Sequence, residues 1–82
     1  MNAAIYQQLQ TYVASDMLKQ PGRAIGPDEA LITSGLVDSF HLVDLALFVE
    51  DSFGVRIDDS ELNADMFDTL AQLSALIESR QN

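Results

Sequence analysis

The chain has 82 residues, 48 % of them hydrophobic and 21 % charged, and a formal net charge of −9. These values predict one small folded domain over residues 1–82, with one modest core and little room for a deep substrate cavity. The chain has no cysteine and a single histidine, His41, which excludes disulfides, thiol chemistry and the usual zinc sites.

The negative charge is concentrated in the second half of the chain. Residues 38–82 hold ten of the 13 acidic residues, and no lysine or arginine occurs between residues 24 and 55. Such a chain repels nucleic acid and anionic membranes, because both are bound through lysine and arginine. The complementary partner is a protein with a basic surface.

Nothing in the sequence predicts export or membrane insertion. Residues 1–5 lack the basic and apolar regions of a secretory signal, and the longest apolar run spans only residues 45–49. We therefore expect a cytoplasmic protein that contacts no membrane. We also expect a monomer.

The first third of the chain predicts a helix followed by a long loop. Apolar residues recur at helical spacing from about Ala3 to Leu18, and Pro21-Gly22 ends this helix. Residues 20–37 form a long connection with a turn at Gly35. We expect this connection to be held to the core by its own apolar side chains, namely Leu31, Ile32, Leu36 and Val37.

The second predicted helix begins at Asp38-Ser39, a pair of preferred N-cap residues, and ends near Phe53. Gly54 then serves as the C-terminal glycine, and residues 55–57 form a short extended link.

Residues 58–67 predict a short third helix, and a capping box over residues 69–72 begins a last helix that ends near Arg80. The expected buried stripe here consists of Met66, Leu70, Leu73 and Ile77. The predicted fold is all-α, a small four-helix bundle with three main helices, a short third helix and a long loop between helices 1 and 2.

The second predicted helix has two apolar faces. At about 100° per residue, its core face carries Leu42, Leu45, Ala46, Val49 and Phe53. The opposite side mixes apolar with acidic residues, namely Phe40, Val43, Asp44, Leu47, Glu50 and Asp51. Two interpretations are open. Either Val43 and Leu47 pack under the long loop, or this side is a docking surface with apolar anchors and steering carboxylates.

Catalytic and metal-binding interpretations are weak. Asp38, Ser39 and His41 lie within four positions at one helix start, where a nucleophile, a base and an orienting acid cannot readily align. The acidic residues after Asp58 do not form an EF-hand, because its glycine and glutamate positions hold Asn63 and Thr69. We expect no catalytic residue and no metal site.

Residues 35–40 read Gly-Leu-Val-Asp-Ser-Phe, follow a long loop and open an acidic helix. This arrangement resembles the acyl and peptidyl carrier protein family, and the likeness covers nearly the whole chain. It implies that Ser39, next to Asp38, receives 4′-phosphopantetheine from coenzyme A. A hydroxyl at a helix N-terminus can project into solvent, and a phosphate on it would lie near free backbone N–H groups.

The resemblance also implies partner docking at Asp38, Asp44, Glu50 and Asp51. The chain departs from the family pattern in three ways: Phe40 replaces a leucine, His41 replaces an acid, and Leu36-Val37 replaces a small pair. Gly-Leu-Val-Asp-Ser looks more like the D-alanyl carrier protein and other specialised or peptidyl-type carriers. The cargo is therefore open among fatty acyl, polyketide-type acyl and aminoacyl groups.

The leading hypothesis is a non-catalytic, stand-alone acyl carrier protein that presents thioester-bound groups to partner enzymes. Its expected partners are a phosphopantetheinyl transferase and loading and processing enzymes with basic docking patches. The competing hypothesis is an unmodified acidic helical adaptor, in which Asp38-Ser39 is only a helix cap. A small serine hydrolase is third, disfavoured by the chain length and the lack of a base.

Overall fold

The computed structural model describes the backbone of residues 3–81 and the side chains of all of these except Ser39. It contains three α-helices, α1 (Ala3–Tyr12), α2 (Leu42–Phe53) and α3 (Leu70–Arg80). Three short helical segments accompany them: the π-helical η1 (Val13–Met17) and the 3-10 turns η2 (Ser39–His41) and η3 (Asp59–Glu61). Residues 3–81 contain no strand, so the prediction of an all-α fold is confirmed.

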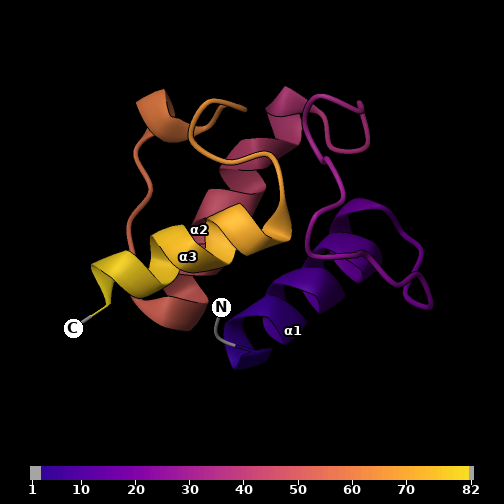
Figure 1. The fold of residues 1–82 in the computed structure, drawn as a ribbon, viewed down its shortest axis with the longest axis horizontal. Coiled ribbons are helices and arrows are strands. Elements are labelled where there is room, and N and C mark those ends of the chain that lie inside the picture. The colour runs from indigo at the N-terminus through magenta and orange to yellow at the C-terminus, as the bar shows by residue number, and fades with distance from the viewer. Residues whose placement is uncertain (1–2, 82) are drawn as a thin grey trace.

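The three α-helices surround one core. Helix α1 contacts α3, and α2 passes behind α3 in the view of Figure 1. The long connection runs along one side of the bundle from the end of η1 to the start of η2 (Figure 1). The radius of gyration is 11.4 Å, close to the ~11.7 Å expected for a compact chain of this length. Across the described part of the chain, no helix is both long and apolar enough to cross a membrane.

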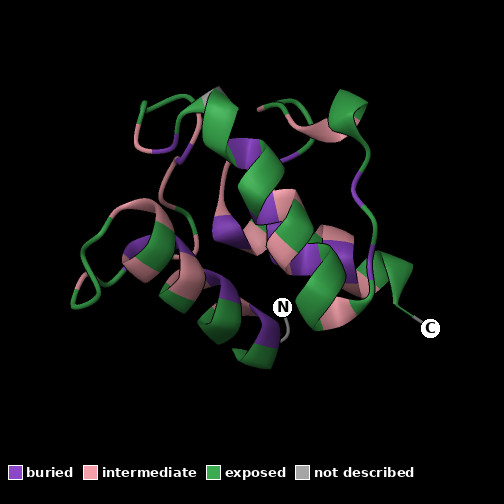
Figure 2. Cartoon of the chain, turned by 180° about the vertical axis from the view of Figure 1, so that it is seen from behind, coloured by how far each residue is buried: buried purple, intermediate pink, exposed green. Residues whose placement is uncertain are grey.

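Each helix turns one face toward the core, as Figure 2 shows by its alternating buried and exposed bands. On α2 the predicted core residues Leu42, Leu45 and Val49 are buried, while Ala46 and Phe53 are half-buried at the edge. Gly54 ends α2 in the left-handed conformation, with φ of 67°, and its N–H donates to the Glu50 carbonyl at 3.0 Å. The predicted end of this helix at Phe53 and its C-terminal glycine are therefore confirmed, whereas its predicted first turn is the 3-10 turn η2 and the α-helix begins at Leu42.

The first helix ends where expected, but through a different residue. Its last turn widens into the π-helical η1, and the N–H of Gln20 donates to the Ala14 carbonyl at 2.7 Å. This bond joins residues six positions apart, one more than in a Schellman C-cap, as the wider π-helical turn requires, and Lys19 takes the left-handed position with φ of 57°. Lys19 thus turns the chain out of the helix before Pro21 is reached.

Hydrophobic side chains anchor the long connection to the core. Leu31 and Val37 are buried, and Ile32 and Leu36 pack partly against the core, which confirms the expected anchors. Ile25 is also buried, and its carbonyl accepts a hydrogen bond from the Tyr6 hydroxyl. No pattern in the sequence predicts this anchor, because Ile25 is a large apolar residue with no apolar neighbours at helical or strand spacing.

The predicted short third helix is reduced to the single turn η3 (Asp59–Glu61). Asn63 stops it: its side-chain oxygen accepts the N–H groups of Asp65 and Met66, at 3.0 and 3.1 Å. Such local bonds offer the backbone an alternative to the helix. The chain then turns so that Phe67 is buried, while Met66 is 39 % exposed. The prediction that Met66 belongs to the buried stripe is therefore wrong.

The segments on either side of this turn are fixed by polar contacts. Thr69 and Gln72 form the predicted capping box at the start of α3. At the other end of α3, Arg80 donates to both carboxylate oxygens of Glu61, one of them at 2.9 Å. The hydrogen bond from Arg80 is the main reason that the pKa of Glu61 is lowered from 4.5 to about 2.

The contrast between Phe67 and Met66 predicts unequal costs of truncation. Phe67→Ala should lower the free energy of unfolding by about 3–5 kcal/mol, because it leaves a cavity in the core. Met66→Ala should cost about 1 kcal/mol or less, because its side chain is largely solvated. Urea denaturation of both variants measures the difference. Equal losses would contradict the burial of Phe67 in place of Met66.

The Glu61–Arg80 pair predicts acid sensitivity. The folded-state pKa of Glu61 lies below its ordinary value of 4.5, so the pair stabilises the fold above that pH. This contribution is lost as the pH falls toward about 2. In Glu61→Gln, the free energy of unfolding should depend less steeply on pH across this window. Asp51→Asn removes the same charge from an exposed position of α2 and serves as the control. If the two variants gave the same pH profile, the pair would contribute nothing to acid stability.

Candidate functional site

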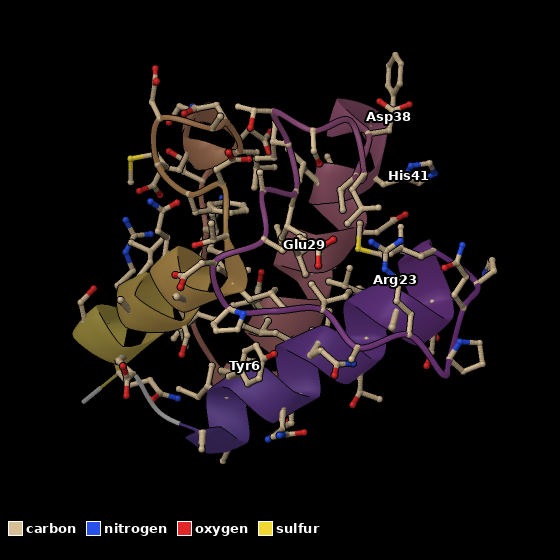
Figure 3. All side chains as sticks on the ribbon, turned by 45° about the vertical axis from the view of Figure 1, so that its right-hand side comes forward. Tyr6, Arg23, Glu29, Asp38 and His41 are labelled. Atoms are coloured by element: carbon tan, nitrogen blue, oxygen red, sulfur yellow. The ribbon has the colours of Figure 1, made fainter. Side chains whose placement is uncertain are left out.

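The Asp38-Ser39 pair lies at the start of η2, which leads directly into α2. The Asp38 carboxylate accepts the N–H of Phe40 at 3.1 Å, and the Asp38 carbonyl accepts the N–H of His41 at 2.9 Å. Asp38 is therefore the cap of this helix start. Figure 3 shows Asp38 and His41 at the outer end of α2, directed away from the bundle. The Ser39 side chain lies outside what the structure describes.

This geometry corrects one detail of the predicted site. A phosphate on Ser39 was expected to meet free N–H groups, but those of Phe40 and His41 are already bonded to Asp38. The surroundings are nevertheless open, since Asp38 and His41 are exposed and Phe40 is 85 % exposed. An arm attached to the residue between them would extend into solvent without displacing core side chains.

Two backbone hydrogen bonds close the loop that precedes this helix start. The N–H of Gly35 donates to the Ile32 carbonyl at 3.1 Å, and the N–H of Val37 donates to the Leu31 carbonyl at 2.9 Å. Gly35 has φ of 78°, a conformation that favours glycine, which confirms the predicted turn. Because Val37 is buried in the core, the segment that leads into Asp38 is fixed to the bundle.

No pattern in the sequence predicts the hydrogen bonds of Asp68, which precedes α3. Its carboxylate accepts the N–H of Ile32 at 2.7 Å, the N–H of Thr33 at 2.9 Å and the Thr33 hydroxyl at 2.6 Å. Its carbonyl accepts the N–H of Leu31 at 2.6 Å. The Thr33 hydroxyl, followed by the backbone donors, holds the pKa of Asp68 below its usual range. In the sequence Asp68 was only one of several clustered acids, and its partners lie more than thirty residues away.

The apolar side chains on the outer side of α2 are accessible. Phe40 is 85 %, Val43 48 % and Leu47 56 % exposed, so these side chains do not pack under the long loop. Asp44, Glu50 and Asp51 are exposed as well. The predicted apolar and acidic residues thus share one accessible surface along η2 and α2, which we call the α2 surface.

Basic side chains elsewhere in the chain are partly engaged in ion pairs with its own carboxylates. Arg23 pairs with Glu29 at 2.7 Å, and Arg80 pairs with Glu61, so two of the four basic side chains are neutralised. Tyr12 donates to the backbone carbonyl of Asp44 at 3.3 Å. Burial, then the charges of Asp44 and Asp16, raise the pKa of Tyr12. A basic partner would therefore meet little competition from the chain's own cations.

The described residues contain no group of three or more side chains able to hold a metal ion. A groove of about 430 Å³ opens between α1, η1 and α2, where Tyr12 stacks on Phe48 with ring centroids 4.1 Å apart. None of the predicted site residues lines this groove.

Comparison with known proteins agrees with this arrangement. Residues 7–77 match the model of a family described as phosphopantetheine attachment site, whereas a search among curated proteins finds no match. The matched segment runs from α1 into α3 and includes the long connection, η2 and α2. Because it covers most of the chain, the chain belongs to the phosphopantetheine attachment family, whose members carry 4′-phosphopantetheine covalently.

Proposed function

We propose that this protein is an acyl carrier protein in which Ser39 is the attachment residue for 4′-phosphopantetheine. The observation that carries the proposal is the helix start at Asp38. It opens an acidic helix with exposed residues on both sides of Ser39, within the segment that matches the attachment family.

The state of other serine hydroxyls supports the choice of Ser39. Ser74 is fully buried in α3 and out of reach of a transferase. The hydroxyls of Ser34 and Ser79 donate to backbone carbonyls at 2.6 and 2.7 Å. Ser39 instead stands at an exposed helix start whose cap is supplied by Asp38, so modification of its oxygen need not break the cap.

The attachment step needs only the serine oxygen from this chain. The Ser39 oxygen forms a new bond to phosphorus and loses its proton, while the pyrophosphate linkage of coenzyme A breaks and adenosine 3′,5′-bisphosphate leaves. When attached, the group supplies a thiol that this cysteine-free chain lacks and on which an acyl group is held as a thioester. The chain contributes an anchored attachment point and a docking surface, and we expect no catalytic residue of its own.

The α2 surface is the proposed docking site for the transferase and for enzymes that load and process the cargo. Apolar side chains supply contact area at Phe40, Val43 and Leu47. Carboxylates at Asp44, Glu50 and Asp51 attract basic patches from a distance. Fatty acyl, polyketide-type acyl and aminoacyl groups all remain candidates for the cargo.

A first prediction tests the attachment residue. The apo protein incubated with coenzyme A and a promiscuous phosphopantetheinyl transferase should gain the mass of one phosphopantetheine. Ser39→Ala should gain none, and the exposed Ser52→Ala should gain it as the native chain does. Ser39→Ala should lower stability by less than ~1 kcal/mol, because Asp38 provides the cap.

The alternative outcomes of this experiment are informative. Unchanged mass of the native chain, with the transferase active on another carrier, would favour the unmodified adaptor. Modification of Ser39→Ala would mean that another hydroxyl is the attachment point.

A second prediction tests the α2 surface. Reversal of its acids to lysine, at Asp44, Glu50 and Asp51, should slow association with the transferase about tenfold at low salt. The loss should shrink as salt rises, because exposed charges are screened beyond ~10 Å. Leu47→Ala should mainly speed dissociation, with little salt dependence, since it removes apolar contact.

The matched control reverses three exposed acids outside α2, namely Asp28, Asp59 and Asp65. Stopped-flow association rates at three salt concentrations distinguish the surfaces. If the control slowed association as much as the α2 reversal, net charge rather than the α2 surface would govern docking.

A further inference from the structure

One carboxylate connects the start of α3 to the loop that precedes Ser39. Asp68 holds three donors of this loop, the N–H groups of Ile32 and Thr33 and the Thr33 hydroxyl, all within 2.9 Å. Two backbone bonds run in parallel with it. Leu31 donates to the Asp68 carbonyl at 2.6 Å, and Ala71 donates to the Pro27 carbonyl at 3.0 Å.

The connection continues from these contacts to the helix start. The carbonyl of Leu31 accepts the N–H of Val37, and Val37 is followed directly by the cap residue Asp38. Leu31 and Val37 are both buried, so the two ends of the 31–37 loop lie on the core. The exposed turn between them, residues 33–35, is held by the Asp68 carboxylate at Thr33.

We propose that Asp68 is a positioning residue for phosphopantetheine attachment, because its carboxylate fixes the 31–37 loop and thereby the orientation of the Asp38-Ser39 helix start. The inference rests on the proposed role of Ser39. Asp68 touches neither coenzyme A nor the reacting oxygen in this scheme. It acts through Leu31, Val37 and Asp38.

The physical reason is the entropy of the loop. Without the carboxylate, three loop donors lose their acceptor and can turn to water, so the 31–37 loop samples more conformations. The part of the α2 surface that lies on α2 itself, from Val43 to Asp51, is not altered by this change, so docking of the transferase there is kept. A smaller fraction of docked complexes then has Ser39 in line with the phosphate, which lowers the rate of the transfer step rather than the affinity.

Four variants test the proposal in the apo protein. Asp68→Ala removes all three side-chain bonds, while Asp68→Asn keeps one oxygen for the N–H groups of Ile32 and Thr33. Thr33→Val removes only the hydroxyl bond. Asp65→Ala is the matched control, since it removes an equal charge three residues away, from a side chain that is exposed.

Two measurements are made at a temperature at which thermal melts show every variant folded. The rate of phosphopantetheine transfer, followed by intact mass over a range of carrier concentrations, gives kcat and KM. Hydrogen exchange of the Ile32, Thr33 and Val37 amides reports on the loop without any cofactor. For Asp68→Ala we expect kcat to fall about three- to tenfold with KM within about twofold, and faster exchange at all three amides.

The transfer rates of the other three variants should fall in a defined order. Asp68→Asn should recover most of the rate, Thr33→Val should lose less than Asp68→Ala, and Asp65→Ala should match the native chain. A native transfer rate in Asp68→Ala, despite faster exchange, would overturn the proposal and leave Asp68 a structural contact only. An increase in KM alone, or an equal loss in Asp65→Ala, would overturn it in favour of a docking or charge effect. If no variant, the native chain included, accepts the group, the proposed function fails instead.

Discussion

The long connection over residues 20–37 is the constraint on which the rest of this small domain depends. Ordering its backbone costs about 1–2 kcal/mol per residue, and a domain of this size has little spare core to offset that cost. Contacts with the core and with the start of α3, spaced along the connection, offset this cost. Ile25, Leu31 and Val37 enter the core, and the start of α3 supplies polar acceptors through Asp68. The loop is thereby part of the fold, and α1 and α3 are joined to α2 through it.

The anchored connection fixes the backbone near Ser39 while the side chains around it stay accessible. Leu31, Val37 and Leu42 are buried on either side of the helix start, so the backbone around Ser39 is anchored at both ends. Between these anchors, Asp38, Phe40 and His41 are exposed. If Ser39 is the attachment point that we propose, it can offer its oxygen to a large partner without unfolding, because the cap and the core contacts belong to neighbouring residues.

The sequence predicted the features that local physical chemistry determines. Helical periodicity placed α2 and its core face at Leu42, Leu45 and Val49, and the capping box at Thr69 placed the start of α3. Prediction failed where distant contacts or competing local bonds decide. The side chain of Asn63 ended the third helix early, so that Met66 is exposed and Phe67 is buried. The contacts of Asp68 span more than thirty residues and leave no local pattern.

The α2 surface combines exposed apolar side chains with a strong negative charge, and this combination selects among partners. Exposed apolar groups such as Phe40 and Leu47 would by themselves favour pairing of two copies of the chain. A two-fold pairing through this surface would bring the carboxylates of Asp44, Glu50 and Asp51 from both copies into one interface. Such like-charge contact is unfavourable, whereas a basic partner gains from both the charge and the apolar contact. The same carboxylates that we propose to attract an enzyme would therefore also oppose self-association.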